Sequence, residues 1–453
     1  MTGNLDSTVG GLGHEIERAL AAGPKTAAEL TKALRTSQPT LSRAIQARPK
    51  TVTSFRVKGL RTPQYALLRT LPMGLTPRQH IYRYLGAGEI REFADVEFLA
   101  GGATLERVDD LTTLYEGLPP YMAFAAPSGF LGRQRAHEAS RSQLFPASLK
   151  DWSDEHRVAY LFSQGLNLPG NLVFGDVSLQ AEMELRNAAP IPVTEKLAHY
   201  VEMASTLRAA AYGSSAGGEQ PKFLSLVEGS GHVIVKFAKL GSRMAQLLPL
   251  EHLALRALGE VAVPAASTQL LAGGGHVFLE VVRFDRIGLT GRIGMLSAGS
   301  VDDEFFGMRD SWPEFAARCE QAKYLSSGDA RHIDTMAAFS ELIGNTDRHF
   351  DNISLLIDED GEYQGVAPAY DILPMRYASI GGGMDPDLTP IEPKIGTIGA
   401  KPKVWERAAR AAERFWLSAQ TEALATPLSR QMRRLAGQNL EVARKFAAPL
   451  LST

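Results

Sequence analysis

The sequence predicts an α+β protein in which a small helical unit with a two-stranded wing precedes a β-rich segment and a mainly helical segment. Three short helical patterns with start or stop signals occupy residues 14–48. From about residue 200, β-like runs alternate with Gly-rich turns. Beyond about residue 300, helical patterns prevail and one polar loop interrupts them. At 453 residues the chain is long enough for several domains, and we expect them at 1–72, 73–195, 196–285 and 286–453.

Composition narrows the class of protein. Apolar residues make up 44% of the chain and charged residues 22%, as in soluble globular proteins. The net charge of −2 excludes a protein that is basic throughout, so any contact with nucleic acid must be local. The single cysteine, Cys319, excludes an internal disulfide framework and fits a reducing compartment. Because no signal peptide or long apolar stretch is present, we expect a cytoplasmic protein.

The first 72 residues predict a winged helix-turn-helix. Residues 1–11 are small, polar and Gly-rich, and we expect them to be disordered. Thr26 followed by Glu29 has the spacing of a capping box, and Ser37 is an N-cap candidate for the third helix. Residues 51–71 alternate around a Gly break, which indicates two strands of a wing.

This unit predicts local DNA binding. The third helix offers short polar side chains and an arginine that can reach base edges: Ser37, Gln38, Thr40, Ser42 and Arg43. Cations at or near the wing can meet phosphates: Arg48, Lys50, Arg56, Lys58 and Arg61. Winged helices also serve as protein-binding modules, and that alternative stays open.

The polar loop in the last third, "IGNTDRHFDNISLLI" (343–357), has the residues that phosphoryl transfer needs. Such a reaction requires a carboxylate to accept the proton of the attacking hydroxyl and oxygen ligands to hold Mg²⁺. Asp347 and Asn352 have the five-residue spacing of a protein-kinase catalytic base and its metal-binding Asn. The intervening sequence predicts a hairpin that returns Asp371 towards Asn352, so both can bind metal.

The matching parts lie upstream. "YGSSAGGEQPKF" (212–223) is a Gly-rich loop, with Gly217 and Gly218, that can lay backbone N–H groups on phosphates. Lys236 lies in an apolar strand and requires an anionic partner, which ATP phosphates can be. Glu251 on the next helix is a candidate for orienting this lysine.

Each part has a plainer interpretation. An Asp–Asn pair in a loop is usually a turn or a cap, and a strand lysine usually lies on an exposed face. Asp347, His349 and Asp351 could instead be the metal ligands of a hydrolase. The kinase interpretation depends on all parts occurring in one chain, in order, at suitable separations.

Five motifs carry a resemblance over about residues 115–440: "GSSAGGEQPKF", "VIVKFA", "EVVRFDR", "GNTDRHFDNISLL" and "AYDILP". They resemble the HipA family of bacterial serine/threonine kinases, and most of all its HipH/YjjJ-like branch. The resemblance implies a bilobed protein-kinase-like fold and transfer of the ATP γ-phosphate to a protein. It implies a toxin–antitoxin system whose outcome is growth arrest or persistence. The best-known members phosphorylate an aminoacyl-tRNA synthetase.

The resemblance also implies roles for individual residues. Asp347 would be the catalytic base, and Asn352 and Asp371 would bind Mg²⁺. Lys236 and His349 would contact phosphates. Val282 to Phe284 would lie at the adenine hinge.

Two departures from the family pattern matter. "SSAGGEQPK" has one residue more than the usual Gly-rich loop, so the family's autophosphorylated serine could be Ser214 or Ser215, or its use could be lost. Many members pair with a separate DNA-binding antitoxin, whereas this chain begins with a helix-turn-helix of its own. The alternative function is a transcription regulator whose kinase-like domain senses a nucleotide or another small ligand.

Overall fold

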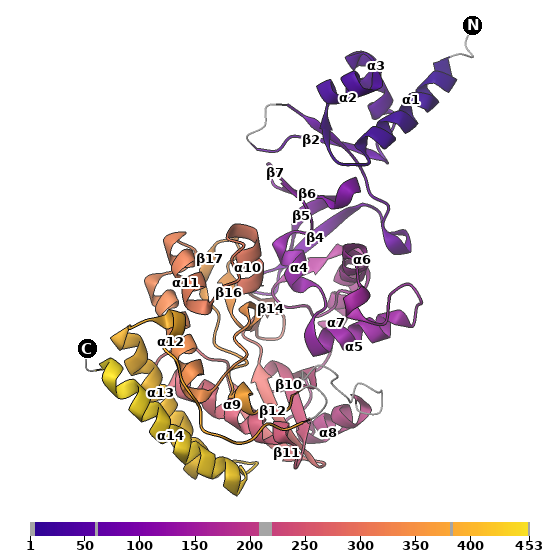
Figure 1. The fold of residues 1–453 in the computed structure, drawn as a ribbon. Coiled ribbons are helices and arrows are strands. Elements are labelled where there is room, and N and C mark those ends of the chain that lie inside the picture. Colours follow the sequence, from indigo (N-terminus) through magenta and orange to yellow (C-terminus); the bar gives the residue numbers. More distant parts are fainter. Residues whose placement is uncertain (1–4, 59–61, 208–219, 381–383, 452–453) are drawn as a thin grey trace.

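The computed structural model describes most of the chain. The described residues are 5–58, 62–207, 220–380 and 384–451. The molecule is elongated, with the N-terminal helices at one end and the last two helices at the other (Figure 1). It is an α+β protein, as the sequence predicts.

The N-terminal unit has three helices and a three-stranded antiparallel sheet of order β1-β3-β2. Thr26 and Glu29 form the expected capping box, and the Ser37 side chain accepts from Thr40 N–H at the start of the third helix. The elements are α1 (Leu5–Leu20), β1 (Lys25–Thr26), α2 (Ala27–Leu34), α3 (Gln38–Gln46), β2 (Val52–Phe55) and β3 (Gln64–Leu67).

One expectation for this unit is wrong. Helix α1 begins at Leu5, whereas residues 1–11 were expected to be disordered. Ile16 and Leu20 bury completely against the other helices and hold the C-terminal half of α1. Extending an existing helix costs far less than nucleating one, so the Gly-rich residues before it continue the helix.

The segment that follows is an antiparallel five-stranded sheet of order β7-β6-β5-β4-β8, with helices packed on it. Its strands are β4 (Arg78–Tyr84), β5 (Ile90–Phe98), β6 (Thr104–Val108), β7 (Leu111–Tyr115) and β8 (Leu172–Phe174). Its helices are α4 (Pro120–Ala125), α5 (Gly129–Ser140), α6 (Asp154–Gln164) and α7 (Gly175–Leu185). Single 3₁₀ turns lie at Pro72–Gly74, Ala100–Gly102 and Leu149–Asp151.

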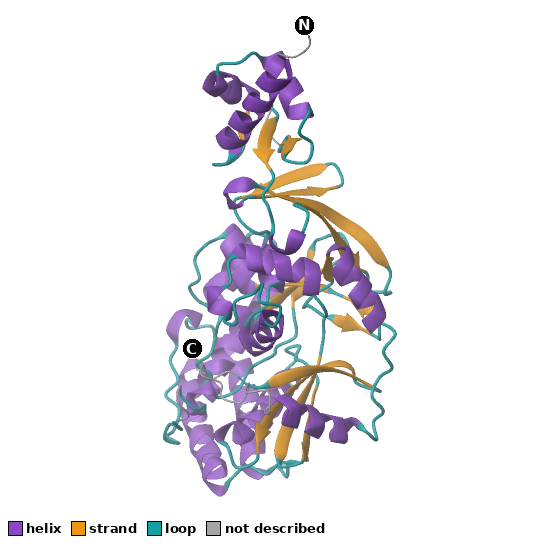
Figure 2. Ribbon diagram, turned by 90° about the vertical axis from the view of Figure 1, so that its right-hand side faces the viewer, coloured by secondary structure: helices purple, strands orange, loops and turns teal. Residues whose placement is uncertain are grey.

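The N-terminal unit is packed onto this sheet. Phe55, Ala66 and Leu68 share a buried cluster with Leu99 and Leu105. The Thr53 hydroxyl donates to Glu97 Oε2 over 2.7 Å in the same buried interface. This N-terminal unit is therefore held against the body of the protein (Figure 2).

The next segment is a four-stranded antiparallel sheet of order β11-β12-β10-β9, packed against the helices that precede and follow its β9–β10 hairpin. Strands β9 and β10 form the expected hairpin, in which Val233 pairs with Ser225. The elements are α8 (Lys196–Leu207), β9 (Lys222–Val227), β10 (Gly231–Lys239), α9 (Arg243–Gly259), β11 (Thr268–Gly273) and β12 (His276–Val282).

The C-terminal part is mainly helical and shares its core with α9. It contains a small sheet of order β15-β16-β17, in which β16 and β17 form the hairpin expected after the polar loop. Its strands are β13 (Arg286–Ile287), β14 (Gly291–Arg292), β15 (Gly294–Ser297), β16 (Ser354–Ile357) and β17 (Tyr363–Val366). Its helices are α10 (Ala298–Phe305), α11 (Trp312–Gln321), α12 (Ser327–Ile343), α13 (Pro402–Thr421) and α14 (Arg430–Leu451). Short 3₁₀ turns lie at Phe350–Asn352, Met375–Tyr377 and Gly396–Ile398.

Within the described ranges, none of the helices combines the length and apolar character needed to cross a bilayer.

Candidate active site

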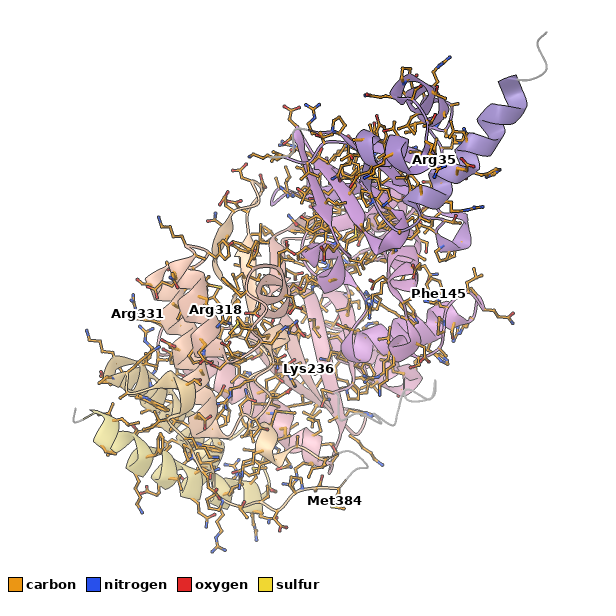
Figure 3. The ribbon with its side chains drawn as sticks, turned by 45° about the horizontal axis from the view of Figure 1, so that its top comes forward. Arg35, Phe145, Lys236, Arg318, Arg331 and Met384 are labelled. Carbon is orange, nitrogen blue, oxygen red and sulfur yellow. The ribbon has the colours of Figure 1, made fainter. Side chains whose placement is uncertain are left out.

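Lys236 lies in the interior of the molecule, between the four-stranded sheet and the helical part (Figure 3). Its side chain is 6% exposed. The ammonium group contacts Glu251 Oε1 on α9 over 2.6 Å and forms a second ion pair with Asp371 Oδ1. A buried lysine is costly without such partners. Glu251 and Asp371 are therefore what keeps Lys236 charged inside the protein.

Within this triad, Lys236 and Asp371 stabilise each other's charge. Burial alone would lower the pKa of Lys236, but the two carboxylates outweigh burial and raise it. Burial also acts on Asp371, yet the positive charges of Lys236 and Lys222 hold its pKa well below the usual range. For Glu251 burial prevails, and its pKa is raised. Asp371 is thus the more acidic of the two carboxylates.

Asp371 also has an unusual backbone. Its φ is +55°, in the left-handed region that non-glycine residues seldom adopt. Such strain persists only where the surroundings impose it, and it is frequent at functional sites.

A cavity of about 290 Å³ opens beside the triad. Lys236, Glu251, Asp371 and Lys222 line one part of it, and apolar side chains line much of the rest. The apolar lining includes Leu224, Ile234, Val281, Val282, Phe284, Met295 and Tyr370. Val282 and Phe284, the expected hinge residues, are thus in the wall, where the Phe284 and Tyr370 rings pack 5.6 Å apart. A mainly apolar cleft with a few charged groups is typical of a ligand site.

Lys222 and Asn167 are cavity residues that the sequence analysis did not single out. Lys222 pairs directly with Lys236 across the β9–β10 hairpin. Like charges in a direct cross-strand pair are destabilising, so two lysines here favour an anionic ligand. The sequence could have predicted this pairing, because residues 222 and 236 are equally far from Gly229 in the turn of the expected hairpin. Asn167 had no such signal, because it comes from a distant loop.

The polar loop has its own contacts. His349 Nε2 lies 2.7 Å from Asp347 Oδ1. The backbone N–H of Asp347 donates to Asn345 Oδ1 over 3.0 Å, and the Asn352 amide donates to the Asp347 carbonyl over 2.8 Å. These bonds fix the loop, and the Asp347 side chain is 37% exposed. Asp351 is exposed and accepts from the Ser297 hydroxyl over 2.9 Å.

The β16–β17 hairpin returns the chain at Asp371 to the end of the polar loop. The hydroxyl of Tyr370, next to Asp371, donates to the Asp351 carbonyl and lies 2.8 Å from Ser354 Oγ. The chain at Asp371 therefore returns beside the end of the polar loop, as the predicted hairpin requires. His349 itself lines a second cavity, of about 490 Å³, together with Arg348, Trp312 and Lys394.

The chain is similar in sequence to known proteins. The chain is 31% identical to "Toxin YjjJ" of Escherichia coli strain K12 over 444 residues, 95% of this chain and 98% of that protein. The model of the YjjJ-like toxin middle domain matches residues 75–183, and that of the HipA-like C-terminal domain matches residues 214–439. The chain belongs to the HipA family, in its YjjJ-like toxin branch.

A solved structure shares the HipA fold. The structure of Shewanella oneidensis MR-1 HipA, in a complex with HipB and operator DNA, matches with a TM-score of 0.50 at 16% identity. The match covers 83% of this chain and 99% of that one. The expected bilobed, kinase-like architecture of this HipA-family chain is thereby confirmed.

The metal donors expected in this HipA-family protein have suitable chemistry. The Asp371 carboxylate and the Asn352 side-chain oxygen are the hard oxygen ligands that Mg²⁺ prefers. The Asn352 amide nitrogen is already used by the Asp347 carbonyl, which leaves its oxygen as the free group of that side chain. In the described part of the chain, no three His, Cys, Asp or Glu side chains converge as metal ligands, so the alternative trio of Asp347, His349 and Asp351 is not assembled.

Several predicted residues lie outside the described ranges. These are Ser214, Ser215, Gly217 and Gly218 of the Gly-rich loop and Arg61 of the wing.

The candidate DNA-reading helix is α3. Gln38 and Arg43 are exposed on it and can reach a ligand. Ser37 and Thr40 are bound to each other over 2.9 Å as part of the helix cap, and Ser42 is partly buried. Arg48 is partly buried and its guanidinium donates to the Ala44 carbonyl, so the exposed cations that follow are Lys50, Arg56 and Lys58.

Proposed function

We propose that this HipA-family protein is an ATP- and Mg²⁺-dependent serine/threonine protein kinase that acts as the toxin of a toxin–antitoxin system. The observation that carries the proposal is the Lys236–Asp371 ion pair at the charged part of an apolar cavity. Lys236 and Lys222 would bind phosphate oxygens, and the walls around Val282 and Phe284 would enclose the adenine. Kinases position ATP in this manner.

Asp347 is the proposed general base. Its side chain is 37% exposed and can accept the proton of a substrate hydroxyl. The 2.7 Å contact with His349 orients it, and His349 can in turn contact phosphate. Mg²⁺, bound by Asn352 and Asp371, would neutralise the charge that develops on the phosphates. The order of these groups in the chain is that of protein kinases, which supports a protein hydroxyl as the acceptor.

A phosphoproteome comparison tests the proposal. Cells expressing the intact chain should gain serine or threonine phosphorylation on few proteins, and cells expressing Asp347→Asn should not. An aminoacyl-tRNA synthetase is one candidate substrate. Identical phosphoproteomes would favour the second function, a regulator whose kinase-like domain only senses a nucleotide.

We also propose that the N-terminal unit binds DNA for autoregulation. The exposed Gln38 and Arg43 of α3 and the cations Lys50, Arg56 and Lys58 support base and phosphate contacts. Whether a separate antitoxin also binds is answered by co-purification from the native host. Titration of the full chain on its own promoter across salt concentrations tests the DNA proposal, since specific binding must exceed binding to random duplex.

The Gly-rich loop is the proposed regulatory element. A phosphate on Ser214 or Ser215 would add nearly two negative charges next to the ATP phosphates and would oppose nucleotide binding. Serines that only cap turns are the alternative. Intact-mass spectrometry of protein incubated with ATP distinguishes them, because a phosphate outside residues 212–218, or none, removes this switch.

A further inference from the structure

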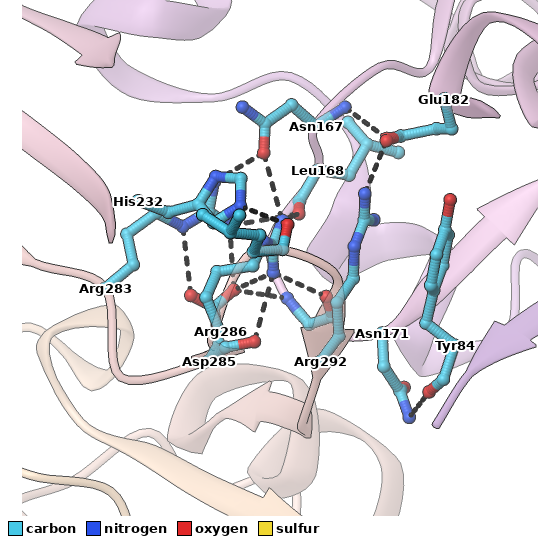
Figure 4. A network of polar contacts seen from close by, with 12 residues as sticks. Tyr84, Asn167, Leu168, Asn171, Glu182, His232, Arg283, Asp285, Arg286 and Arg292 are labelled. Carbon is cyan, nitrogen blue, oxygen red and sulfur yellow. Dashed lines mark hydrogen bonds and ion pairs between the residues drawn. The ribbon is translucent and has the colours of Figure 1, made fainter. Parts of the chain in front are cut away.

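A second cluster of buried charges lies where the YjjJ-like middle domain meets the end of strand β12 (Figure 4). Three guanidinium groups are gathered there, with side chains 3–8% exposed: Arg283, Arg286 and Arg292. Asp285 pairs with Arg283 and Arg286, and Glu182 pairs with Arg292. Three positive and two negative groups leave one buried positive charge without a counter-charge.

The arginines are placed in a way that ordinary sheet packing disfavours. Arg286 and Arg292 are direct cross-strand partners in the β13–β14 pair. Like charges in that position repel each other. Among the described residues, Arg286 Nε and Arg292 Nη1 have no hydrogen-bond partner although both atoms are buried. An unpaired buried charged donor costs more than an ordinary unmade hydrogen bond.

Arg286 and Arg292 both line a small cavity, and so do Arg186, His232 and Glu182. Its volume is about 20 Å³, which is room for one particle of the size of water. His232 donates from Nε2 to the Leu289 carbonyl over 2.9 Å, and burial lowers its pKa, so it adds no charge. The cavity is therefore lined by positively charged guanidinium groups and has space for a single small ligand.

We propose that this cavity is a site for one small monovalent anion, of which chloride is the physiological example. Its single charge balances the excess of the cluster, and it can accept from the two unpaired guanidinium nitrogens. Sulfate and phosphate are too large for the space. A water molecule fits the space but leaves the charge unbalanced.

The anion would hold two parts of the protein together. Arg283 and Arg286 donate to Asn167 and to the Leu168 carbonyl, and Gly170 N–H donates to Asp285 Oδ2 over 2.9 Å. These bonds join the loop before β8 to the segment after β12. Asn167, Arg283 and Asp285 also line the 290 Å³ cavity, so the anion site lies directly behind the wall of the candidate active site.

Thermal unfolding of the full chain in chloride, bromide or gluconate at one ionic strength tests the proposal. The unfolding midpoint should be about 2–4 °C higher in the two halides, because they bind the folded state and gluconate is too large. Arg292→Gln removes the excess charge and should abolish the difference. Glu182→Gln increases the excess and should enlarge it. Arg410→Gln, the same charge change on an exposed part of α13, should behave as the intact chain.

Equal midpoints in halide and gluconate, or an unchanged halide effect in Arg292→Gln, would overturn the proposal. If Arg292→Gln does not fold, crystals of the intact chain grown in bromide decide. An anomalous peak in contact with Arg286 and Arg292 is expected, and its absence would overturn the proposal.

Discussion

The Lys236 ammonium group contacts the Asp371 carboxylate although the two residues are 135 positions apart in the chain. The contact joins strand β10 of the sheet-rich part to the segment that follows the β16–β17 hairpin. It therefore links the two lobes at the point where the cavity is charged.

Lys236→Met should destabilise the protein and abolish nucleotide binding. Removing the lysine leaves Glu251 and Asp371 without their shared partner, and breaking a buried pair from one side costs about 3–5 kcal/mol. Thermal unfolding and ATP titration measure the two effects. Lys239→Met, at an exposed position of the same strand, is the control and should change neither. Nucleotide binding at the level of the intact chain would contradict the assignment of Lys236.

Asp371→Asn should weaken binding of Mg²⁺-ATP and lower turnover. A neutral amide replaces the ionised carboxylate, which is the stronger ligand for a hard cation. Calorimetric titration of ATP with and without Mg²⁺ separates the metal effect from a loss of structure. The increase in ATP affinity on adding Mg²⁺ should be smaller in the variant. An increase as large as in the intact chain would show that Asp371 is not a metal ligand.

The stability that Asp371 provides should depend on pH. Its carboxyl has a pKa below the unfolded value of 3.8, so the unfolded chain takes up the proton first as the pH falls. The contribution is complete above about pH 5 and is lost as the pH falls through the lowered pKa. The difference in unfolding midpoint between the intact chain and Asp371→Asn should be largest near neutrality and shrink below about pH 4. A constant difference over that range would contradict the ion pair.

Asp347→Asn should lose phosphoryl transfer and keep nucleotide affinity. The change preserves shape but removes the base, whose contribution is about 10²–10⁴-fold. Single-turnover transfer to the identified substrate and ATP titration measure the two quantities. Asp351→Asn, four positions away in the same loop, is the matched control, because its carboxylate is exposed and accepts from the Ser297 hydroxyl. If Asp347→Asn retained more than about a tenth of the activity, Asp347 would not be the base.

Arg43→Ala should weaken binding to the promoter and reduce its preference over random DNA. The side chain is exposed on α3, where a base-edge contact provides about 1–3 kcal/mol of discrimination. Lys50→Ala should instead weaken binding to all sequences and reduce the salt slope by about one unit. Competition titrations at several salt concentrations distinguish the two results. Arg410→Ala on α13 is the control, and an effect equal to that of Arg43→Ala would point to non-specific electrostatics.

Local sequence determined much of this protein. The Thr26 capping box, the Ser37 N-cap and the hairpins at Gly229 and at 358–361 depend on residues that are near neighbours in the chain. Helix caps and hairpin turns depend on interactions within a few residues, so they can be predicted without a structure. The motif spacing likewise pointed to Lys236, Asp347 and Asp371 before their positions in space were known.

Only the tertiary structure decided what these residues contact. That Lys236 pairs with Asp371 as well as Glu251, that Arg48 is partly buried, and that Asn167 lines the cavity all depend on segments far apart in sequence. The same holds for the excess positive charge at Arg286 and Arg292, whose balance requires knowing that Glu182 and Asp285 lie beside them. Ion pairs between buried groups are costly to break from one side. Whether a group is buried depends on how the whole chain packs and cannot be read from any one segment of the sequence.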